Sequence, residues 1–214
     1  MSATTLQEKT AAKPSRFSSR YIKAKAFESY LRMVVRPPQA LSAIPGYLHP
    51  LEARFLYWLA AKVPANGLAL EVGSYKGKSS AHLAAGLTPT ARLACVDTWQ
   101  NDAMPYDPAT DVLPEFLENI GEYRSLIKTH RGRSAEVAAD WSQPIDLLFI
   151  DGDHSYEGCS TDLQAWLSHV RPGGWIAFHD SSEAGVERAI AELFPPSQRT
   201  SDLRAWSILA AMKR

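Results

Sequence analysis

Short apolar segments alternate with helical segments along most of the chain. The apolar runs that we expect to be strands occupy residues 68–72, 92–96, 125–130, 145–150 and 175–178. Helical patterns follow them at residues 79–85, 113–121, 134–140, 156–169 and 183–193. This alternation predicts right-handed βαβ units, and therefore an α/β fold with a mostly parallel sheet covered by helices on both faces. A last apolar run, residues 206–212, is expected to join the sheet edge as an antiparallel strand.

The segment before the first strand has a different pattern. The first 15 or so residues are polar, and we expect them to be disordered. Residues 16–35 predict a helix that Pro37 and Pro38 stop, and residues 50–63 predict a second helix. The apolar stripe of the first helix is formed by Tyr21, Phe27, Tyr30, Leu31 and Val34. We therefore divide the chain into a basic tail with a helical extension, residues 1–43, and a main domain, residues 44–214.

The composition is that of one globular α/β domain. The chain has 214 residues, of which 45% are hydrophobic, enough for one sizeable core. Its 23 basic and 23 acidic residues cancel, so the overall charge gives no reason to expect nucleic acid or an anionic membrane as a partner. Residues 1–40 hold eight Lys or Arg and two Glu, a local excess of about +6. Such a basic segment is typical of a solvated tail, with a docking surface as the alternative.

Two cysteines do not make a disulfide framework. Cys95 lies in an expected buried strand and Cys159 just inside an expected helix, so we expect two reduced thiols in a cytoplasmic protein. No segment approaches the roughly 18 consecutive apolar residues of a membrane span, and the first residues show no apolar signal core. We therefore expect no membrane partner.

The stretch EVGSYKGKSS joins the first strand to its helix through a glycine loop. A phosphate-binding loop needs four residues between its first glycine and Gly-Lys-Ser, whereas Gly73 and Gly77 enclose three, and Glu71 adds a negative charge. The dinucleotide fingerprint G-x-G-x-x-G is also absent. An acidic residue at this position suits a ligand that carries an amine and a positive sulfonium. Asp97, at the end of the second strand, is well placed to bind two ribose hydroxyls.

Acidic residues also follow the fourth and fifth strands. In LLFIDGDHSYEG an apolar run is followed by Asp151, Asp153 and His154, and in RPGGWIAFHD the fifth strand ends at His179 and Asp180. If these strands are neighbours, Asp151 and Asp180 emerge side by side, where each carboxylate raises the pKa of the other unless a cation lies between them. A divalent metal satisfies this condition. The alternative for Asp153 is a cap on the helix that follows.

Together, EVGSYKGKSS, VDTW, GRSAEV, FIDGDHSYEG, DLQAWL and RPGGWIAFHD resemble the motifs of class I methyltransferases that use S-adenosylmethionine (SAM), over about residues 44–192. They are most similar to the branch that contains antibiotic-sugar O-methyltransferases and cephalosporin-hydroxylase-associated proteins. The resemblance implies a Rossmann-like, seven-stranded sheet of order 3-2-1-4-5-7-6, with SAM over the carboxyl ends of the first strands. The cofactor residues that it implies are Glu71, Gly73, Ser74, Gly77 and Ser79 near the methionine part, Asp97 at the ribose, Thr98 and Trp99 beside the ribose or adenine, Gly132, Arg133 and Ser134 near the adenine edge, and Asp151.

The same resemblance implies a metal and a base. In the resembled sugar methyltransferases the fourth-strand Asp and an acidic pair after the fifth strand hold magnesium, and a His three residues after the fourth-strand Asp is the base. Asp151, Asp180 and His154 match these positions, whereas His179 replaces an acidic residue. The expected metal ligands are therefore Asp151, His179 and Asp180. Magnesium is the first expectation, with manganese or calcium as alternatives, although an imidazole ligand also tilts a site towards iron or zinc.

The activity implied is that of a metal-assisted O-methyltransferase with His154 as the proton acceptor. Its acceptor would be a hydroxyl of a small molecule such as a sugar, a catechol-like compound or a natural product. Two alternatives stay open. One is a SAM-binding scaffold without activity, and the other is a metal-dependent hydrolase, which would leave the glycine loop and Asp97 without a role.

Two segments are expected to shape the acceptor site. The irregular stretch NDAMPYDPATDVLP suits a lid or substrate loop, in which Met104 and Tyr106, with Trp99, either form an apolar wall for the acceptor or pack beneath the loop. The apolar stripe of the N-terminal helix needs something to cover it. We expect this helix to fold over the cofactor pocket or to form a homo-oligomer contact.

Overall fold

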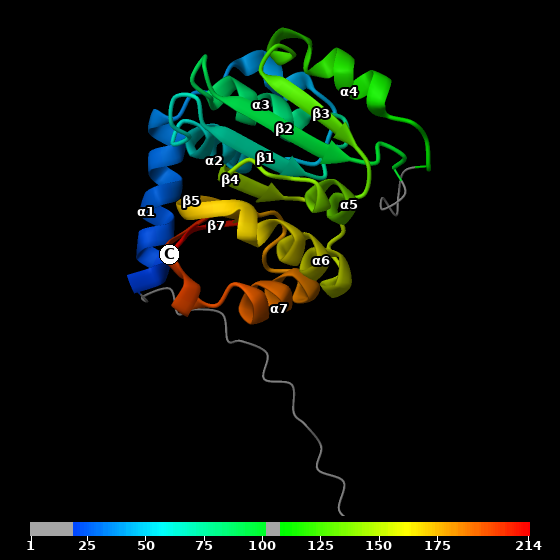
Figure 1. Ribbon diagram of the computed structural model, residues 1–214. Coiled ribbons are helices and arrows are strands. Elements are labelled where there is room, and N and C mark those ends of the chain that lie inside the picture. Colours follow the sequence, from blue (N-terminus) through cyan, green and yellow to red (C-terminus); the bar gives the residue numbers. More distant parts are fainter. Residues whose placement is uncertain (1–18, 102–107) are drawn as a thin grey trace, which may run out of the picture.

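The computed structural model describes residues 19–101 and 108–214 and has one seven-stranded sheet between two layers of helices (Figure 1). The expected disordered tail, together with Met104 and Tyr106 of the expected lid, lies outside these residues. The strands are β1 (Leu68–Val72), β2 (Arg92–Asp97), β3 (Ile127–Arg131), β4 (Ile145–Ile150), β5 (Val170–Phe178), β6 (Arg199–Ala205) and β7 (Ile208–Lys213). Their order is β3-β2-β1-β4-β5-β7-β6, which confirms the predicted Rossmann-like sheet.

The last hairpin differs from the pattern-based prediction. Strands β1 to β5 pair in parallel, and β7 pairs antiparallel with both β5 and β6. The expected final strand therefore exists, but it lies between β5 and β6 and not at the edge. The edge strand is β6, which the apolar pattern missed because its middle is polar and exposed. Polar side chains are common on edge strands, where they discourage pairing with other chains.

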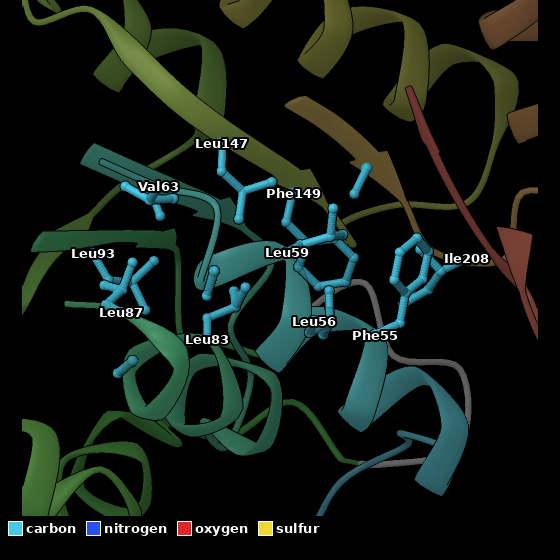
Figure 2. Close-up of a cluster of buried hydrophobic side chains, with 14 of the residues drawn as sticks. Phe55, Leu56, Leu59, Val63, Leu83, Leu87, Leu93, Leu147, Phe149 and Ile208 are labelled. Carbon is cyan, nitrogen blue, oxygen red and sulfur yellow. The ribbon is translucent and has the colours of Figure 1, made fainter. Parts of the chain in front are cut away.

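Helices cover both faces of the sheet (Figure 1). One layer contains α1 (Ser19–Val34), α2 (Pro50–Ala60), α3 (Lys78–Gly86) and α4 (Leu113–Asn119), and the other contains α5 (Ser134–Ala139), α6 (Tyr156–Trp166) and α7 (Ala184–Leu193). Successive strand residues point to opposite faces, so Leu147 and Phe149 of β4 join the first core, and Leu148 and Ile150 join the second. Figure 2 shows the first core, where side chains of α2 and α3 meet those of β4.

The fifth strand begins earlier than the sequence indicates. Pairing with β4 passes from Ile145–Val170 directly to Leu147–Trp175, so the turn expected at residues 171–174 is an irregularity within β5. Gly173, with a φ of +79°, supplies the left-handed backbone that this irregularity needs. Beyond it the strands pair in register to their ends, so the residues that follow β4 and β5 emerge next to each other.

The N-terminal helix α1 packs on the core through part of the expected stripe. Leu31 is fully buried, and the ring of Phe27 meets those of Phe55 and Trp58 edge-on at 5.2 Å. Tyr30 and Val34 belong to the expected stripe but are exposed. The apolar side chains on the exposed side of α1 are Ile22, Tyr30, Met33 and Val34.

Both cysteines are free and buried, in agreement with the expected reduced thiols. Burial raises the pKa of the Cys159 thiol to about 11, which keeps it protonated and unreactive at neutral pH. Within residues 19–101 and 108–214, no helix has the length and apolar character that crossing a bilayer requires.

Replacing Leu31 with alanine is expected to lower the free energy of unfolding by about 2–5 kcal/mol, because the change leaves a cavity under α1. Met33→Ala, in the same helix but 67% exposed, is the matched control and should change this free energy by less than about 0.5 kcal/mol. Urea unfolding followed by circular dichroism measures both values. Equal effects of the two substitutions would contradict the packing described for α1.

Candidate functional site

A cleft of about 620 Å³ opens at the carboxyl ends of the central strands. Its walls come from the loops after β1 to β4 and from the first turns of α5 and α6. Open α/β sheets bind their ligands at this edge. The lining brings together these predicted site residues: Gly73, Asp97, Thr98, Gly132, Arg133, Ser134 and Asp151.

Gly73 allows the ends of β1 and β4 to approach each other. Its φ of +82° lies in the left-handed region, and a Cβ atom on it would lie 2.1 Å from the carbonyl oxygen of Asp151. Any side chain there would force the backbone apart, so this position requires glycine. Gly77 has a different setting, since a Cβ atom on it would meet Phe116 and Ile120 at 3.0 Å, and it does not line the cleft.

Asp97 fixes the shape of the glycine loop. Its Oδ2 accepts hydrogen bonds from the backbone N–H groups of Ser74 (2.7 Å) and Tyr75 (2.8 Å), and its Oδ1 accepts one from Trp99 (2.6 Å). A carboxylate offers about four acceptor positions, so about one is left for a ligand. The Trp99 ring is buried 4.9 Å from the ring of Phe116 and lies outside the cleft lining.

Glu71, Ser74 and Ser79 lie beneath the loop and outside the lining of the cleft. The Glu71 carboxylate is fully buried, and its Oε2 accepts hydrogen bonds from the hydroxyls of Ser74 (2.9 Å) and Ser80. Its Oε1 has no hydrogen-bond partner among the described residues. Burial raises the pKa of Glu71 to about 7, against the opposing effect of the Ser79, Ser80 and Ser74 hydroxyls. These side chains therefore support the loop from below.

Asp151, His179 and Asp180 meet at the next pair of strand ends. Because Ile150 of β4 pairs with Phe178 of β5, the residues after the two strands lie side by side. His179 Nδ1 is 3.0 Å from Asp151 Oδ1 and 3.2 Å from Asp180 Oδ2. Both distances are short enough for a hydrogen bond, but the angles at Nδ1 are not suitable for one. This buried nitrogen therefore has no hydrogen-bond partner in the described part of the chain.

His154 faces the same carboxylates. Its Nε2 lies 3.5 Å from Asp151 Oδ1, and its Nδ1 lies 3.5 Å from Asp180 Oδ2 and 3.8 Å from Glu183 Oε2. The Asp151 carboxylate above all, and then Asp180 and Glu183, raise the pKa of His154 against the opposing effect of burial. The side chain is 35% exposed, so a small molecule can reach it.

Glu52, which the sequence analysis did not single out, faces His179 from the opposite side. This α2 carboxylate is almost fully buried, and its Oε2 lies 3.3 Å from His179 Nε2 and accepts a hydrogen bond from the His49 backbone N–H at 2.8 Å. Its Oε1 accepts hydrogen bonds from the backbone N–H and the hydroxyl of Ser207, in the β6–β7 turn. Burial acts to raise the pKa of Glu52, but the contacts with His179 and Ser207 outweigh it and lower the pKa.

A protonated His179 can supply the positive charge that the carboxylates of Asp151, Asp180 and Glu52 need. Burial alone would lower the pKa of His179, but the charge of Asp151 and the contacts with Asp180 and Glu52 outweigh it and raise the pKa to about 12. The neighbouring imidazole lowers the pKa of Asp180 to about 2. A protonated His179 therefore balances the carboxylates around it whenever no other cation does so.

The same donors fit a divalent cation. One ligand atom each from Asp151, His154 and His179 lie within 4.8 Å of one another, and so do ligand atoms of His154, Asp180 and Glu183. His154 belongs to both groups, whereas the three expected ligands, Asp151, His179 and Asp180, do not form such a group in the described part of the chain, because Asp151 and Asp180 lie on either side of His179 Nδ1. Nδ1 of His179 has no hydrogen-bond partner among the described residues, so it is available as a metal ligand once it has lost its proton. Its Nε2 faces the Glu52 carboxylate, and metal-bound imidazoles usually have such a partner at the second nitrogen. A metal here would compete with the proton on His179.

Two further carboxylates lie in the cleft wall. Asp153 accepts hydrogen bonds from the N–H (2.8 Å) and the hydroxyl (2.9 Å) of Ser155, and it is Ser155 that caps α6 through the N–H of Gly158. Asp162, which the sequence analysis missed, lines the cleft from α6. Burial raises the pKa of Asp162 to about 6, against a hydrogen bond from Ser134. Nothing in the local pattern around Asp162 indicates that it reaches the cleft.

Comparisons with known sequences relate the chain to one family. A family model described as a methyltransferase domain matches residues 70–181. The uncharacterized protein y4gI of Sinorhizobium fredii is 27% identical over 117 residues, which cover 52% of this chain and 13% of that protein. The chain thus spans only a small part of that curated relative.

Solved structures share the fold. An O-methyltransferase from Bacillus cereus in complex with S-adenosylhomocysteine (SAH) superposes with a TM-score of 0.65 at 18% identity, over 90% of this chain and 99% of that one. CalS11, a TDP-rhamnose 3'-O-methyltransferase of calicheamicin biosynthesis, gives a TM-score of 0.59 at 16% identity, over 91% and 95% of the two chains. At these identities the likeness concerns the fold.

The buried Glu71 carboxyl makes stability depend on pH. Its pKa of about 7 in the folded protein lies above the ordinary value of 4.5, so the folded state binds more protons than the unfolded state between these values, and stability falls as pH rises through them, by about 3 kcal/mol in total. Glu71→Gln is expected to lose this part of the decline, whereas Glu118→Gln, at an exposed position of α4, should keep it. Urea unfolding at pH 5 and pH 8 measures the decline, and equal declines in wild type and Glu71→Gln would contradict the prediction.

Proposed function

Because the chain belongs to the methyltransferase domain family, we propose that it is a methyltransferase, which transfers the methyl group of SAM to a hydroxyl of a small-molecule acceptor with the help of a divalent metal. One observation carries the proposal. Beside the cleft, which Asp151 lines, His179 Nδ1 lies within 3.2 Å of oxygens from Asp151 and Asp180, next to His154. Such a group suits an acceptor that chelates a metal, while the rest of the cleft is free for a cofactor.

We expect SAM to lie along the cleft from Gly73 to Ser134. Asp97, beside Thr98, keeps about one acceptor position after its three backbone hydrogen bonds, which suffices for one ribose hydroxyl. The adenine is expected near Gly132, Arg133 and Ser134, and the sulfonium near the negative charge of Asp151.

The expected metal ligands are Asp151, Asp180 and Nδ1 of His179. Bound there, a divalent cation would supply Lewis acidity that lowers the pKa of a chelated hydroxyl. Magnesium and calcium prefer oxygen ligands. The imidazole of His179 therefore makes manganese a stronger candidate than magnesium or calcium. Glu52 supports this assignment, because a carboxylate opposite Nε2 leaves Nδ1 as the donor.

His154 is the proposed proton acceptor. Methyl transfer is an in-line displacement at the methyl carbon of SAM: the acceptor oxygen forms the new bond as the carbon–sulfur bond breaks, and the sulfur leaves in a neutral thioether. Alignment and the exclusion of water therefore supply most of the acceleration. The acceptor hydroxyl must still lose its proton, and His154 lies beside the proposed ligands Asp151 and Asp180. This position favours an enzyme over a SAM-binding scaffold, since a scaffold has no use for it. A hydrolase would leave Gly73 and Asp97 without a role.

We also expect a homo-oligomer that forms through the exposed apolar side of α1.

The balanced net charge supports a protein without a nucleic-acid or membrane partner. The two free thiols support a cytoplasmic location.

Replacing Asp97 with asparagine is expected to weaken the binding of SAH, the demethylated form of SAM, at least tenfold. The amide nitrogen of asparagine cannot accept a hydrogen bond, so the change removes acceptors from the loop and from the ribose. Asp140→Asn, at an exposed position outside the cleft lining, should leave the affinity within about twofold. Calorimetric titration with SAH measures both. Unchanged affinity in a folded Asp97→Asn protein would overturn the cofactor assignment.

Asp180→Asn is expected to weaken Mn²⁺ binding about tenfold or more, because it removes a charged ligand oxygen, and to leave SAH affinity nearly unchanged.

His154→Ala is the complementary variant, whose turnover of the probe acceptor catechol should fall about 10²- to 10⁴-fold while SAH still binds. Calorimetry with MnCl₂ and with SAH, and an assay of SAH release, measure these effects. Turnover that survives complete chelation would remove the metal from the proposal, and unchanged turnover in His154→Ala would remove the base.

A further inference from the structure

The two-residue turn between β6 and β7 carries a tryptophan where glycine is usual. Ala205 pairs with Ile208, so Trp206 and Ser207 form the whole turn. Trp206 has a φ of +56°, whereas Ser207 is not among the described residues with positive φ. Hairpin turns with positive φ at the first position favour glycine there, because a side chain resists this conformation. Backbone strain of this kind occurs often at functional sites.

Burial does not compensate for the strain. Trp206 is 62% exposed, so most of it stays in contact with water. Its ring lies flat against the His49 imidazole, with the ring centroids 3.9 Å apart and the planes 7° apart. The imidazole covers one face of the indole. The exposure of Trp206 shows that much of its remaining surface is open.

The turn lies beside the proposed metal ligands. β7 runs antiparallel to β5 and pairs Leu209 with Phe178, so the turn before β7 is level with His179 and Asp180 after β5. The Ser207 hydroxyl accepts a hydrogen bond from the backbone N–H of Asp180 at 3.2 Å. Trp206 therefore directly precedes a residue, Ser207, that contacts the proposed metal ligand Asp180.

Glu52 anchors both members of the stacked pair. Its two oxygens accept the backbone N–H groups of His49 (2.8 Å) and Ser207 (3.2 Å), while Oε2 also faces His179. The indole and the imidazole under it are thus fixed relative to the proposed ligand His179. A surface held in this way is ready for a ligand before the ligand arrives.

A second aromatic pair, Tyr47 and Tyr75, lies beside the proposed cofactor cleft. Tyr47 lies two residues before His49, is 64% exposed, and stacks on Tyr75 with centroids 6.2 Å apart and planes at 26°. Tyr75 lines the cleft and also has a positive φ, of +44°. Aromatic side chains therefore border the site on the side of the hairpin turn and on the side of the cleft.

We infer that Trp206, supported by His49, is a stacking platform that selects acceptors with a planar ring. This inference rests on the proposed methyltransferase function and adds a specificity-determining residue to it. A planar aromatic ring gains offset stacking over the indole face beyond plain hydrophobic contact. A puckered ring with the same two hydroxyls can reach the same ligands but cannot lie flat on Trp206. The indole itself takes no part in methyl transfer.

The test compares catechol with cis-1,2-cyclohexanediol, which carries two adjacent hydroxyls on a puckered ring. Each is titrated calorimetrically into the 214-residue chain with MnCl₂ and SAH present. Wild type is expected to bind catechol at least about tenfold more tightly than the saturated diol. Phenolic hydroxyls are more acidic than alcohols and chelate a metal better, so part of this preference does not depend on the indole. Trp206→Gly should reduce the preference about threefold to tenfold, the part that stacking supplies, and Trp206→Phe should keep most of it. Tyr30→Ala, at an exposed ring of α1, should leave it unchanged.

Stability and SAH binding separate the outcomes. A purely structural Trp206 would make Trp206→Gly melt at a lower temperature, whereas we expect no decrease, because glycine adopts the positive φ without strain. SAH affinity should stay within about twofold of wild type. If wild type binds SAH but shows no preference for catechol, or if the preference is as large in Trp206→Gly as in wild type, the inference is overturned and the proposed function stands. If wild type binds no SAH, both are overturned.

Discussion

One buried carboxylate, that of Glu52, joins three parts of the chain that are distant in sequence. It caps the start of α2 through His49, faces the residue after β5, His179, and receives the β6–β7 turn through Ser207. A buried charge costs free energy unless its hydrogen bonds are satisfied, and here both oxygens have partners. Removing any partner would leave the others around an incompletely paired charge. The group around His179, where we propose that the acceptor binds, is therefore a cooperative unit, in which each contact depends on the rest.

A different carboxylate organises the part of the cleft where we propose that the cofactor binds. Asp97 holds three backbone N–H groups, so the glycine loop has its shape without a ligand, and little ordering is left for binding to cause. Gly73 then lets this loop lie against the backbone of Asp151. Asp151 lines the cleft and also approaches His179, so it is the point at which this part of the cleft meets the group around His179. The separate anchors explain why changes in one of them can leave the other intact.

The sequence predicts β1, β2 and β4 well, because strands buried on both faces appear as nearly unbroken apolar runs, while the polar edge strand β6 leaves no such signal. It also brings Asp151 and Asp180 together, since neighbouring strands share a carboxyl edge. Glu52 could not be found in this way. A glutamate three residues after His49 is fully explained as a helix cap, and its partners 127 and 155 residues away depend on packing. Glu71 shows the same limit, because a strand pattern does not tell whether a side chain rises into the cleft or stays beneath the loop.

The β6–β7 turn also bears on how such a protein can diverge. It is only two residues long, it closes the last hairpin, and it contributes nothing to the pairing of β1, β2 and β4, which carry the cofactor loops. A substitution at Trp206 therefore changes the surface next to Asp180 and leaves the parallel strands as they are. On the role that we propose for Trp206, natural selection can test new acceptors through this turn at little risk to folding, so descendants of one ancestor should differ in substrate here before they differ in cofactor.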